Sequence, residues 1–421
     1  MPFIFVATLV TAVAVFIWPA LADWNASSIV ASRVGLISPA ALPDRPSHSA
    51  APGRLVVVYE ADGWVRVIDG DDFQTRWRFR PAFTPRGGAV YSPDGRSFFL
   101  RSGNGWVGKY DFFALKPVAR IRAGHTLHDL AVSSDGKWLL AANARPSTIA
   151  VLNADDLSLF KVIPAETDRG APLRVAALHD AGPRRSFIVA LWNTAEIWEL
   201  SYDPDAAPVY GNFVHSYRAG QVEGVVVEEQ PFARRRLKMA EPLSGFFFDP
   251  AYAEVIATGR TGGVVHNLDA RRKVAGLALT GAPRFSAGVS WPKVDRQFMA
   301  VPDNEQAIID IVDMETWQTV RRIKTGGLVQ SLISHPKSPY IWANVVPRPH
   351  EPGIQVIDKQ TLTIVKSIAP ARQSIGLHAA FTRDGRHVLV ADLLGGEMLK
   401  IYDALALREV KRLPMVRPRL R

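Results

Sequence analysis

A short apolar strand with the same kind of ending, usually Asp, recurs eight times along this sequence. Successive endings are separated by 42, 42, 47, 69, 44, 45 and 45 residues. A repeat of about 40–50 residues that carries four short strands is typical of a β-propeller blade. The sequence therefore predicts an all-β fold, an eight-bladed β-propeller, with these endings: Asp69, Asp111, Asn153, Leu200, Asp269, Asp313, Asp358 and Asp403.

Tight turns fall inside the same repeat, for example Ser92-Pro93-Asp94-Gly95 and Thr382-Arg383-Asp384-Gly385. Asp-Gly between apolar runs favours a hairpin, because Gly adopts the positive φ that the turn requires. Residues 407–413 read as one more strand at the end of the last blade. The first blade has no obvious innermost strand before Arg54, and residues 27–40 are the candidate to supply it.

The first 22 residues carry no charge and end in Ala20-Leu21-Ala22, which is the pattern of a secretory signal peptide. The segment is also long enough to span a bilayer, so a retained anchor remains an alternative. Both interpretations place the folded part in the periplasm. The expected domains are the signal or anchor at 1–22, an arm or linker at 23–53 and the propeller at 54–421.

The sequence contains no cysteine. This excludes disulfides, thiolate metal sites, a cysteine nucleophile and covalent haem attachment through Cys-x-x-Cys-His. The formal charge of +10 suits either an ordinary solvated surface or an anionic ligand or membrane. Nucleic acid is not an expected partner, because no basic-aromatic motif is present. No nucleotide, metalloprotease or serine hydrolase motif appears either, so the sequence leaves open whether the protein is an enzyme.

The step from Leu200 to Asp269 holds roughly 20 residues more than a blade needs. We expect residues 215–245 to form an excursion over one face of the ring. The densest basic run of the chain, residues 234–238, lies within it and ends at Lys238.

The innermost strands of a propeller all begin at one mouth of the central channel, and here their heads fall near Arg86, Arg174 and Arg284. Guanidinium groups that converge on one cavity repel each other unless an anion such as a carboxylate lies between them. The alternative is that each arginine pairs with a nearby Asp or backbone carbonyl. His128 and His378 occupy two further strand heads, where imidazole could ligate a metal or transfer a proton, or serve as a hydrogen-bonded structural group.

Several phrases of the sequence resemble the d1-type propellers, which are the haem d1 domain of cytochrome cd1 nitrite reductase and, more closely, the NirF-type haem d1-biosynthesis proteins. The resemblance covers roughly residues 54–410. It rests on these segments: residues 173–178, 187–192, 195–198, 237–246, 281–283 and 377–382.

This resemblance implies a tetrapyrrole, haem d1 or a precursor, at the channel mouth. It implies that Arg86, Arg174, Arg284 and Lys238 bind the carboxylates of the ligand. It also implies that His378 and His128 act in metal binding or proton transfer, with no resident metal site certain.

The sequence departs from the family at the positions expected to hold axial or catalytic histidines. Those positions fall near Arg86-Gly87, at Gly170, at Ser286 and at Glu241-Pro242. Nitrite reduction is therefore not expected, and there is no cytochrome c domain to supply electrons.

The leading hypothesis is a periplasmic accessory propeller that binds a tetrapyrrole during haem d1 maturation for nitrite reductase. Its expected partners are the tetrapyrrole and other haem d1-maturation proteins or nitrite reductase itself. A non-catalytic scaffold for protein–protein interaction, which has lost haem d1 binding, is the alternative. A quinoprotein-like or metal-dependent oxidoreductase is a third reading, for which the sequence supplies few ligands.

Overall fold

The computed structural model describes residues 24–48, 53–60, 63–214, 224–259, 262–279, 281, 283–284, 287–303, 305–346, 353–369, 377–392 and 398–415. For residues 211–214, 224–226, 259, 377–378 and 392 it describes the backbone only. The signal or anchor predicted at 1–22 lies outside the described residues. No helix among the described residues is long and apolar enough to cross a membrane.

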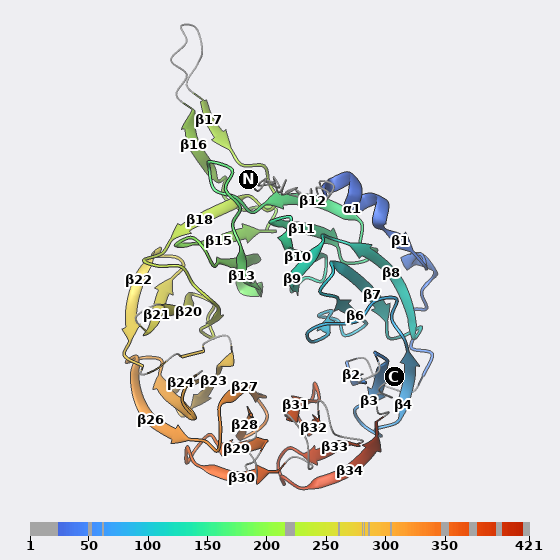
Figure 1. Ribbon diagram of the computed structural model, residues 1–421, viewed down its shortest axis with the longest axis vertical. Coiled ribbons are helices and arrows are strands. Elements are labelled where there is room, and N and C mark those ends of the chain that lie inside the picture. Colours follow the sequence, from blue (N-terminus) through green and yellow to red (C-terminus); the bar gives the residue numbers. More distant parts are fainter. Residues whose placement is uncertain are drawn as a thin grey trace, which may run out of the picture.

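The chain forms eight small antiparallel sheets arranged as blades around one central axis (Figure 1). The eight-bladed propeller predicted from the repeat is confirmed. Blades 1–4 consist of β2 (Leu55–Tyr59), β3 (Val65–Asp69) and β4 (Thr75–Phe79); β5 (Val90–Tyr91), β6 (Ser97–Arg101), β7 (Trp106–Asp111) and β8 (Lys116–Arg122); β9 (Thr126–Val132), β10 (Trp138–Arg145), β11 (Thr148–Asn153) and β12 (Leu159–Pro164); and β13 (Val175–Ala181), β14 (Ser186–Leu191), β15 (Glu196–Ser201) and β18 (Arg234–Lys238).

Blades 5–8 follow in chain order. They consist of β19 (Phe246–Phe248), β20 (Glu254–Gly259), β21 (Gly262–Asn267) and β22 (Arg272–Leu277); β23 (Val289–Lys293), β24 (Arg296–Pro302), β25 (Ile308–Asp313) and β26 (Gln318–Lys324); β27 (Val329–Ser334), β28 (Tyr340–Val345), β29 (Ile354–Asp358) and β30 (Ile364–Ile368); and β31 (Leu377–Phe381), β32 (His387–Asp392), β33 (Met398–Asp403) and β34 (Glu409–Pro414).

The recurring Asp of the sequence ends the third strand of its blade and caps the turn into the fourth. Asp69, Asp313 and Asp403 each accept a backbone N–H two residues further on, at 2.9 Å. An Asp side chain that satisfies its own turn in this way stabilises a tight connection without needing glycine. The repeat of about 45 residues is therefore a turn motif that recurs in most blades, and in blade 5 Asn267 takes the place of the Asp.

Residues 24–48 do not supply the missing strand of blade 1. Helix α1 (Ala26–Ser32) packs on the outer rim with Ile29 fully buried, and β1 (Val34–Gly35) pairs with β8 as a fifth, outermost strand of blade 2. A single-turn helix η1 (Pro39–Ala41) follows. The prediction that residues 27–40 fill blade 1 is therefore wrong, since backbone pairing and apolar burial hold this arm at the outside of the ring.

The excursion predicted at 215–245 is only partly present. The extra length forms a separate hairpin, β16 (Tyr210–Val214) and β17 (Gly224–Val227), which points away from the ring in Figure 1. Residues 234–238 instead form β18, the outermost strand of blade 4, because their side chains alternate across a strand that pairs with β15. A second single-turn helix, η2 (Gly182–Arg184), lies between β13 and β14.

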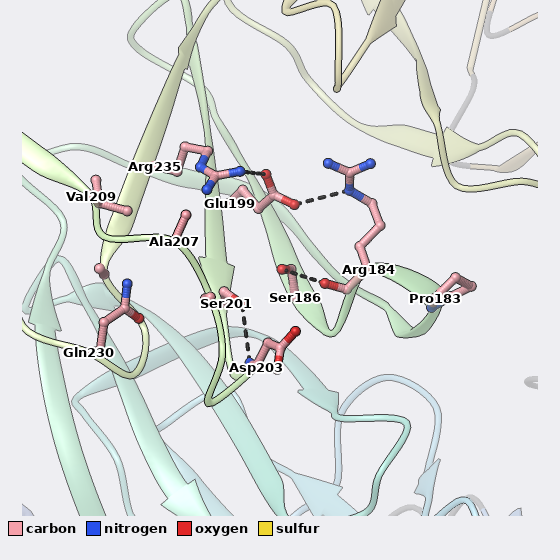
Figure 2. A pocket seen from close by; sticks show the side chains of 12 residues that line it. Pro183, Arg184, Ser186, Glu199, Ser201, Asp203, Ala207, Val209, Gln230 and Arg235 are labelled. Atoms are coloured by element: carbon pink, nitrogen blue, oxygen red, sulfur yellow. Dashed lines mark hydrogen bonds and ion pairs between the residues drawn. The ribbon is translucent and has the colours of Figure 1, made fainter.

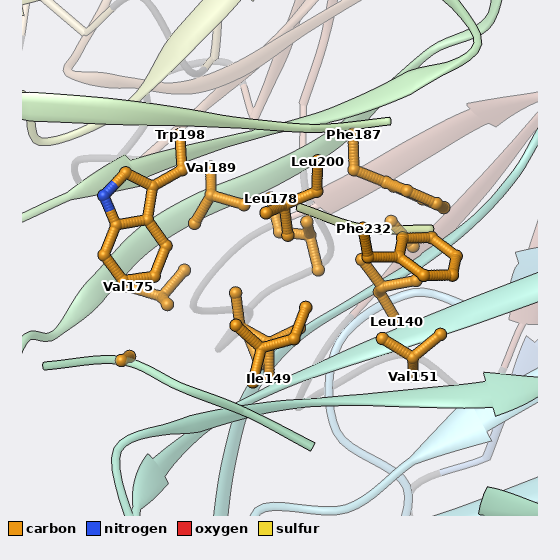
Figure 3. Close-up of a cluster of buried hydrophobic side chains, with 14 of the residues drawn as sticks. Leu140, Ile149, Val151, Val175, Leu178, Phe187, Val189, Trp198, Leu200 and Phe232 are labelled. Carbon is orange, nitrogen blue, oxygen red and sulfur yellow. The ribbon is translucent and has the colours of Figure 1, made fainter. Parts of the chain in front are cut away.

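The core lies between neighbouring blades. Figure 3 shows one such layer, in which Leu140 and Ile149 of blade 3 face Val189 and Trp198 of blade 4. All four side chains are fully buried. Burying a side chain of this size stabilises a fold by about 1.5–3 kcal/mol, so each blade depends on its neighbours.

The seam between blades 1 and 8 is closed by side chains, and no strand described in the structure is shared across it. Ile68 and Phe73 of blade 1 pack with Leu389, Leu399 and Ile401 of blade 8. Arg54 and Arg386 both contact Asp384, and Arg386 also pairs with Asp71 across the seam. The first and last blades are therefore held together by an apolar layer with an ion-pair cluster beside it.

A buried carboxyl at the junction of blades 3 and 4 predicts a pH-dependent stability. Tyr202 donates a hydrogen bond of 2.9 Å to Asp180, and burial raises the pKa of Asp180 from its ordinary value of 3.8 to about 6. Because the folded protein holds this proton more tightly than the unfolded chain does, its stabilisation is complete below pH 3.8 and is lost as the pH rises through 6. We expect the free energy of unfolding of the native protein, relative to that of Asp180→Asn, to fall by about 1 kcal/mol between pH 4 and pH 7, the carboxyl being partly solvated. Urea denaturation of both proteins across this range measures it, and parallel pH curves would contradict the assignment.

Candidate functional site

The heads of the inner strands meet at one mouth of the ring. In seven blades the innermost strand is followed by an antiparallel second strand, so all seven inner strands run the same way and begin at the same face. Three arginines lie just before inner strands: Arg86 before β5, Arg174 before β13 and Arg284 before β23. His128 is the third residue of β9, and His378 is the second residue of β31. The structure therefore places these five residues around one opening, as the repeat predicted.

The backbone of each arginine is fixed by its own blade. The N–H of Arg86 donates to the carbonyl of Arg101 at 2.7 Å, and that of Arg284 donates to the carbonyl of Pro302 at 2.8 Å. The N–H of Arg174 donates to Oδ1 of Asn193 at 2.8 Å. The second strand of a blade ends where the first begins, so these contacts anchor each strand head to the strand that pairs with it.

The side chains of the three arginines are exposed and carry no carboxylate partner among the residues that the structure describes. Arg284 donates to the carbonyl of Gln330 at 3.2 Å, which agrees with the backbone-pairing alternative for this one residue. Blades 2, 4 and 6 supply the arginines, so the guanidinium groups surround the opening rather than cluster at one point. This arrangement leaves positive charge available to a ligand with several carboxylates.

His128 bridges two blades. Its Nε2 lies 3.1 Å from the carbonyl oxygen of Ala176 in blade 4, and Nη1 of Arg101 in blade 2 donates to its backbone carbonyl. Because a carbonyl only accepts, Nε2 carries the proton, and a neutral imidazole then has its lone pair at Nδ1. His128 thus holds blades 2, 3 and 4 together at the mouth, and Nδ1 is the atom left for a ligand.

His378 is placed by its backbone alone. In β31 it pairs with Ala391 of β32, and the next N–H, that of Ala379, donates to Oδ1 of Asn344 in blade 7 at 3.0 Å. Its side chain lies outside what the structure describes, so its predicted role stays a prediction. Ser286, one of the departures from the family pattern, also lies outside the described residues.

Lys238 lies on the same face as the inner-strand heads, but at the outer rim of the ring rather than at the central mouth. It ends the outermost strand of blade 4, where it pairs with Glu196 of β15. The expectation that it covers the channel followed from treating residues 215–245 as a loop, and β18 removes that basis.

Sequence reasoning missed Arg101, Asn344 and Arg145, which lie at or near the ends of second strands and therefore at the same mouth. The signal for them was present in the repeat, because an antiparallel second strand ends beside the head of the first. Arg101 and Arg145 add to the positive charge of the opening, and Asp303 is a buried carboxylate there that accepts from the N–H of Glu305 and of Gln306. Among the described residues, no three His, Asp or Glu side chains gather as a metal site.

A polar cavity of about 290 Å³ lies at the opposite end of blade 4 (Figure 2). Arg184 donates to Glu199 at 3.0 Å, and Arg235 lies 3.6 Å from the same carboxylate. Glu199 is buried and thus neutralises much of the charge of both guanidiniums. The cavity is therefore less suited to an anionic ligand than the mouth with its unpaired arginines.

Comparison with known protein families and relatives agrees with this geometry. The family described as "Cytochrome D1 heme domain" matches residues 52–419. "Dihydro-heme d1 dehydrogenase" from Pseudomonas aeruginosa is 38% identical over 399 residues, covering 94% of this chain and 76% of the relative. "Protein NirF" from Stutzerimonas stutzeri is 26% identical over 368 residues, covering 86% of this chain and 89% of the relative.

A solved structure of dihydro-heme d1 dehydrogenase NirN in complex with DHE has the same fold. It superposes with a TM-score of 0.84 at 38% identity, covering 95% of this chain and 82% of that chain. The expected likeness to the d1-type propellers is thus confirmed, but the expected closer likeness to NirF is not, because the dehydrogenase is the more similar of these two relatives.

Proposed function

The chain belongs to the cytochrome D1 heme domain family, and from that premise we propose that it binds haem d1 or a dihydro precursor at the mouth where its inner strands begin. In this proposal it is a periplasmic protein of haem d1 maturation. The ring of Arg86, Arg174 and Arg284, with side chains that no described carboxylate neutralises, is the observation that carries the proposal.

The residues at the mouth fit a tetrapyrrole with several carboxylates. Arginine binds a carboxylate through two parallel N–H donors, and three arginines from alternate blades reach the ligand from different sides. The bound tetrapyrrole would itself supply the iron and the redox chemistry. His378 and Nδ1 of His128 are the groups that we assign to the metal or to proton transfer.

The relative that is 38% identical is named for dehydrogenation of dihydro-heme d1, and its similarity extends over 94% of this chain. This supports a place at the last steps of haem d1 assembly, where the precursor is held or oxidised. The scaffold alternative retains its own support in the family histidine positions that here hold other residues, such as Gly170 and Glu241. The periplasmic location rests on the uncharged segment that ends in Ala20-Leu21-Ala22.

An absorbance titration with haem d1, and with ordinary haem as a control, tests the proposal. We expect a saturable one-to-one spectral shift with haem d1 that His378→Ala abolishes, because the imidazole is assigned to the metal. His335→Ala is the matched control, since His335 is half-buried in a hairpin turn at the opposite end of its blade, away from the mouth. If neither compound shifts the spectrum, the fold has been kept without its ligand and the scaffold alternative takes its place.

A further inference from the structure

In the part of the chain that the structure describes, blade 1 has no innermost strand. It contains β2, β3 and β4 only, whereas each of the other seven blades has a first strand between its second strand and the central axis. Residues 24–48 do not supply that strand, because they run along the outer rim and Ser47 and His48 are hydrogen-bonded to the loop after β7. Figure 1 shows β2 at the inner end of blade 1.

The free edge of β2 presents backbone groups at alternate residues. Two residues that flank β2 form backbone hydrogen bonds on the side of β3. The carbonyl of Arg54 accepts from the N–H of Gly70 at 3.0 Å, and the N–H of Glu60 donates to the carbonyl of Trp64 at 2.8 Å. Since neighbouring residues of a strand point their N–H and C=O in opposite directions, those of Leu55, Val57 and Tyr59 point to the open edge. No described strand pairs with that edge.

A tyrosine hydroxyl confirms this direction. The N–H of Val57 donates to Oη of Tyr91, the last residue of β5 in blade 2, over 3.0 Å. Oη of Tyr91 thus takes the place of a carbonyl that an inner strand would offer. One side-chain contact at the middle residue is a poor substitute for a ladder, which leaves an unprotected strand edge.

A cavity of about 580 Å³ occupies the place of the missing strand. It is lined by all five residues of β2 and by apolar groups of the two neighbouring blades, including Ala89 and Phe381. It follows β2 from Leu55 to Tyr59, a length of about 17 Å for five extended residues, and also reaches Gly53 just before the strand. The space therefore has the length and the apolar walls that suit a β-strand.

Arg383 lies at the end of this cavity where β2 begins, and it is the charged residue of the lining. Its Nη2 donates to the carbonyl of Pro93 at 2.7 Å, and no described carboxylate pairs with it. Gly53 and Gly95, both at positive φ, leave room for the guanidinium, because a Cβ on Gly53 would come within 2.8 Å of Nη1. A strand antiparallel to β2 would bring its C-terminal end to this point.

We propose that this groove is a strand-acceptor site, which takes an extended apolar peptide segment of a different protein antiparallel to β2, with a carboxylate at its C-terminal end paired with Arg383. In two other blades an Asp follows the inner strand in the equivalent turn: Asp135 in blade 3 and Asp384 in blade 8. Adding a strand to an exposed edge is an established mode of peptide recognition, in which backbone hydrogen bonds supply affinity and apolar pockets supply selectivity. The site does not depend on tetrapyrrole binding.

A fluorescein-labelled peptide that copies residues 126–135, the inner strand of blade 3 with its following Asp and a free carboxylate, is the probe. We expect saturable binding by fluorescence anisotropy. The same peptide, methylated at the backbone nitrogens that would face β2, should bind at least about ten-fold more weakly, because it cannot form the backbone hydrogen bonds to β2. Equal binding of the methylated peptide would overturn the proposal in favour of a simple apolar pocket.

Three variants refine the test. Val57→Pro removes the middle donor of the open edge, where a strand tolerates proline, and should weaken binding about ten-fold. Tyr91→Phe frees the same donor and should strengthen binding, which keeps the proposal testable if Val57→Pro does not fold. Arg383→Ala should weaken binding of this peptide, but not of a version that ends in an Asn amide in place of Asp135 and so has no carboxylate at that end.

Two further outcomes would count against the proposal. A concentration-dependent dimer that Val57→Pro dissolves, seen by analytical ultracentrifugation, would assign the groove to a second copy of the chain. Displacement of the peptide by haem d1 would place both ligands in one cavity. Failure of the haem d1 titration alone leaves the strand-acceptor site standing, since its readout is a different probe.

Discussion

The double variant Arg174→Ala/Arg284→Ala is expected to bind haem d1 at least about ten-fold more weakly than the native protein. A hydrogen bond to a charged group in a desolvated site is worth about 1.5–3 kcal/mol, and 1.4 kcal/mol corresponds to a factor of ten. Both side chains are exposed in the free protein and without a carboxylate partner in the described part of the chain, so little native structure is lost with them. The absorbance titration that detects binding gives the two dissociation constants.

Removing two positive charges also weakens any anion binding through the overall field, so the comparison needs a variant with the same charge. Arg272→Ala/Arg321→Ala removes two exposed arginines from the outer strands β22 and β26. We expect its affinity for haem d1 to stay within about two-fold of the native value at 0.15 M salt, where charges far from the mouth are screened. Equal losses in the two double variants would remove the assignment of a carboxylate clamp.

Asp384→Ala is expected to cost about 3 kcal/mol of folding free energy, because it opens the ion-pair cluster at the seam between blades 1 and 8. Asp384 accepts from Arg54 and Arg386 and from the hydroxyl of Thr382 at 2.6 Å. Its side chain is only 12% exposed. Alanine leaves both guanidiniums without this acceptor in a confined site.

The effect of this substitution should depend on pH in a defined direction. Although partial burial opposes it, hydrogen bonds from Thr382 and Arg386 hold the pKa of Asp384 well below its ordinary value of 3.8. A carboxyl with a lowered pKa in the folded state stabilises above the pKa of the unfolded chain and loses that effect as the pH falls through the folded value. Urea denaturation should therefore show the full difference at pH 7 and a shrinking one below about pH 4. Asp205→Ala, an exposed aspartate of blade 4, is the control and should change stability by less than about 0.5 kcal/mol.

The blade count could be predicted from sequence because its signal is local. Asp69, Asp313 and Asp403 cap a turn within a few residues of themselves, and this need recurs in the blades wherever the chain passes from third to fourth strand. The position of the arm could not be predicted in this way. Ile29 and the β1–β8 pairing depend on residues about 90 positions away, which no local pattern encodes.

The same difference between local and distant signals decides which residues of the candidate site could be predicted. Arg86, Arg174 and Arg284 were found because the repeat fixes where inner strands begin, whereas Lys238 was misplaced because a basic run was read as a loop. Leu237, which is buried between the exposed side chains of Arg236 and Lys238, was the available sign of a strand. The bridge from His128 to Ala176 joins two blades 48 residues apart, and only the closed ring shows it.

The seam has a mechanical consequence. Within each blade, strands are joined by ladders of backbone hydrogen bonds, but the described contacts between the two ends of the propeller are side-chain packing, ion pairs and single bonds such as that from Arg66 to the carbonyl of Pro414 at 2.9 Å. A tensile load applied at residues 53 and 415 would act first on these contacts and would pull the ring into an open arc before any ladder shears. The seam between blades 1 and 8 is thus the point at which the ring is expected to open first under tension.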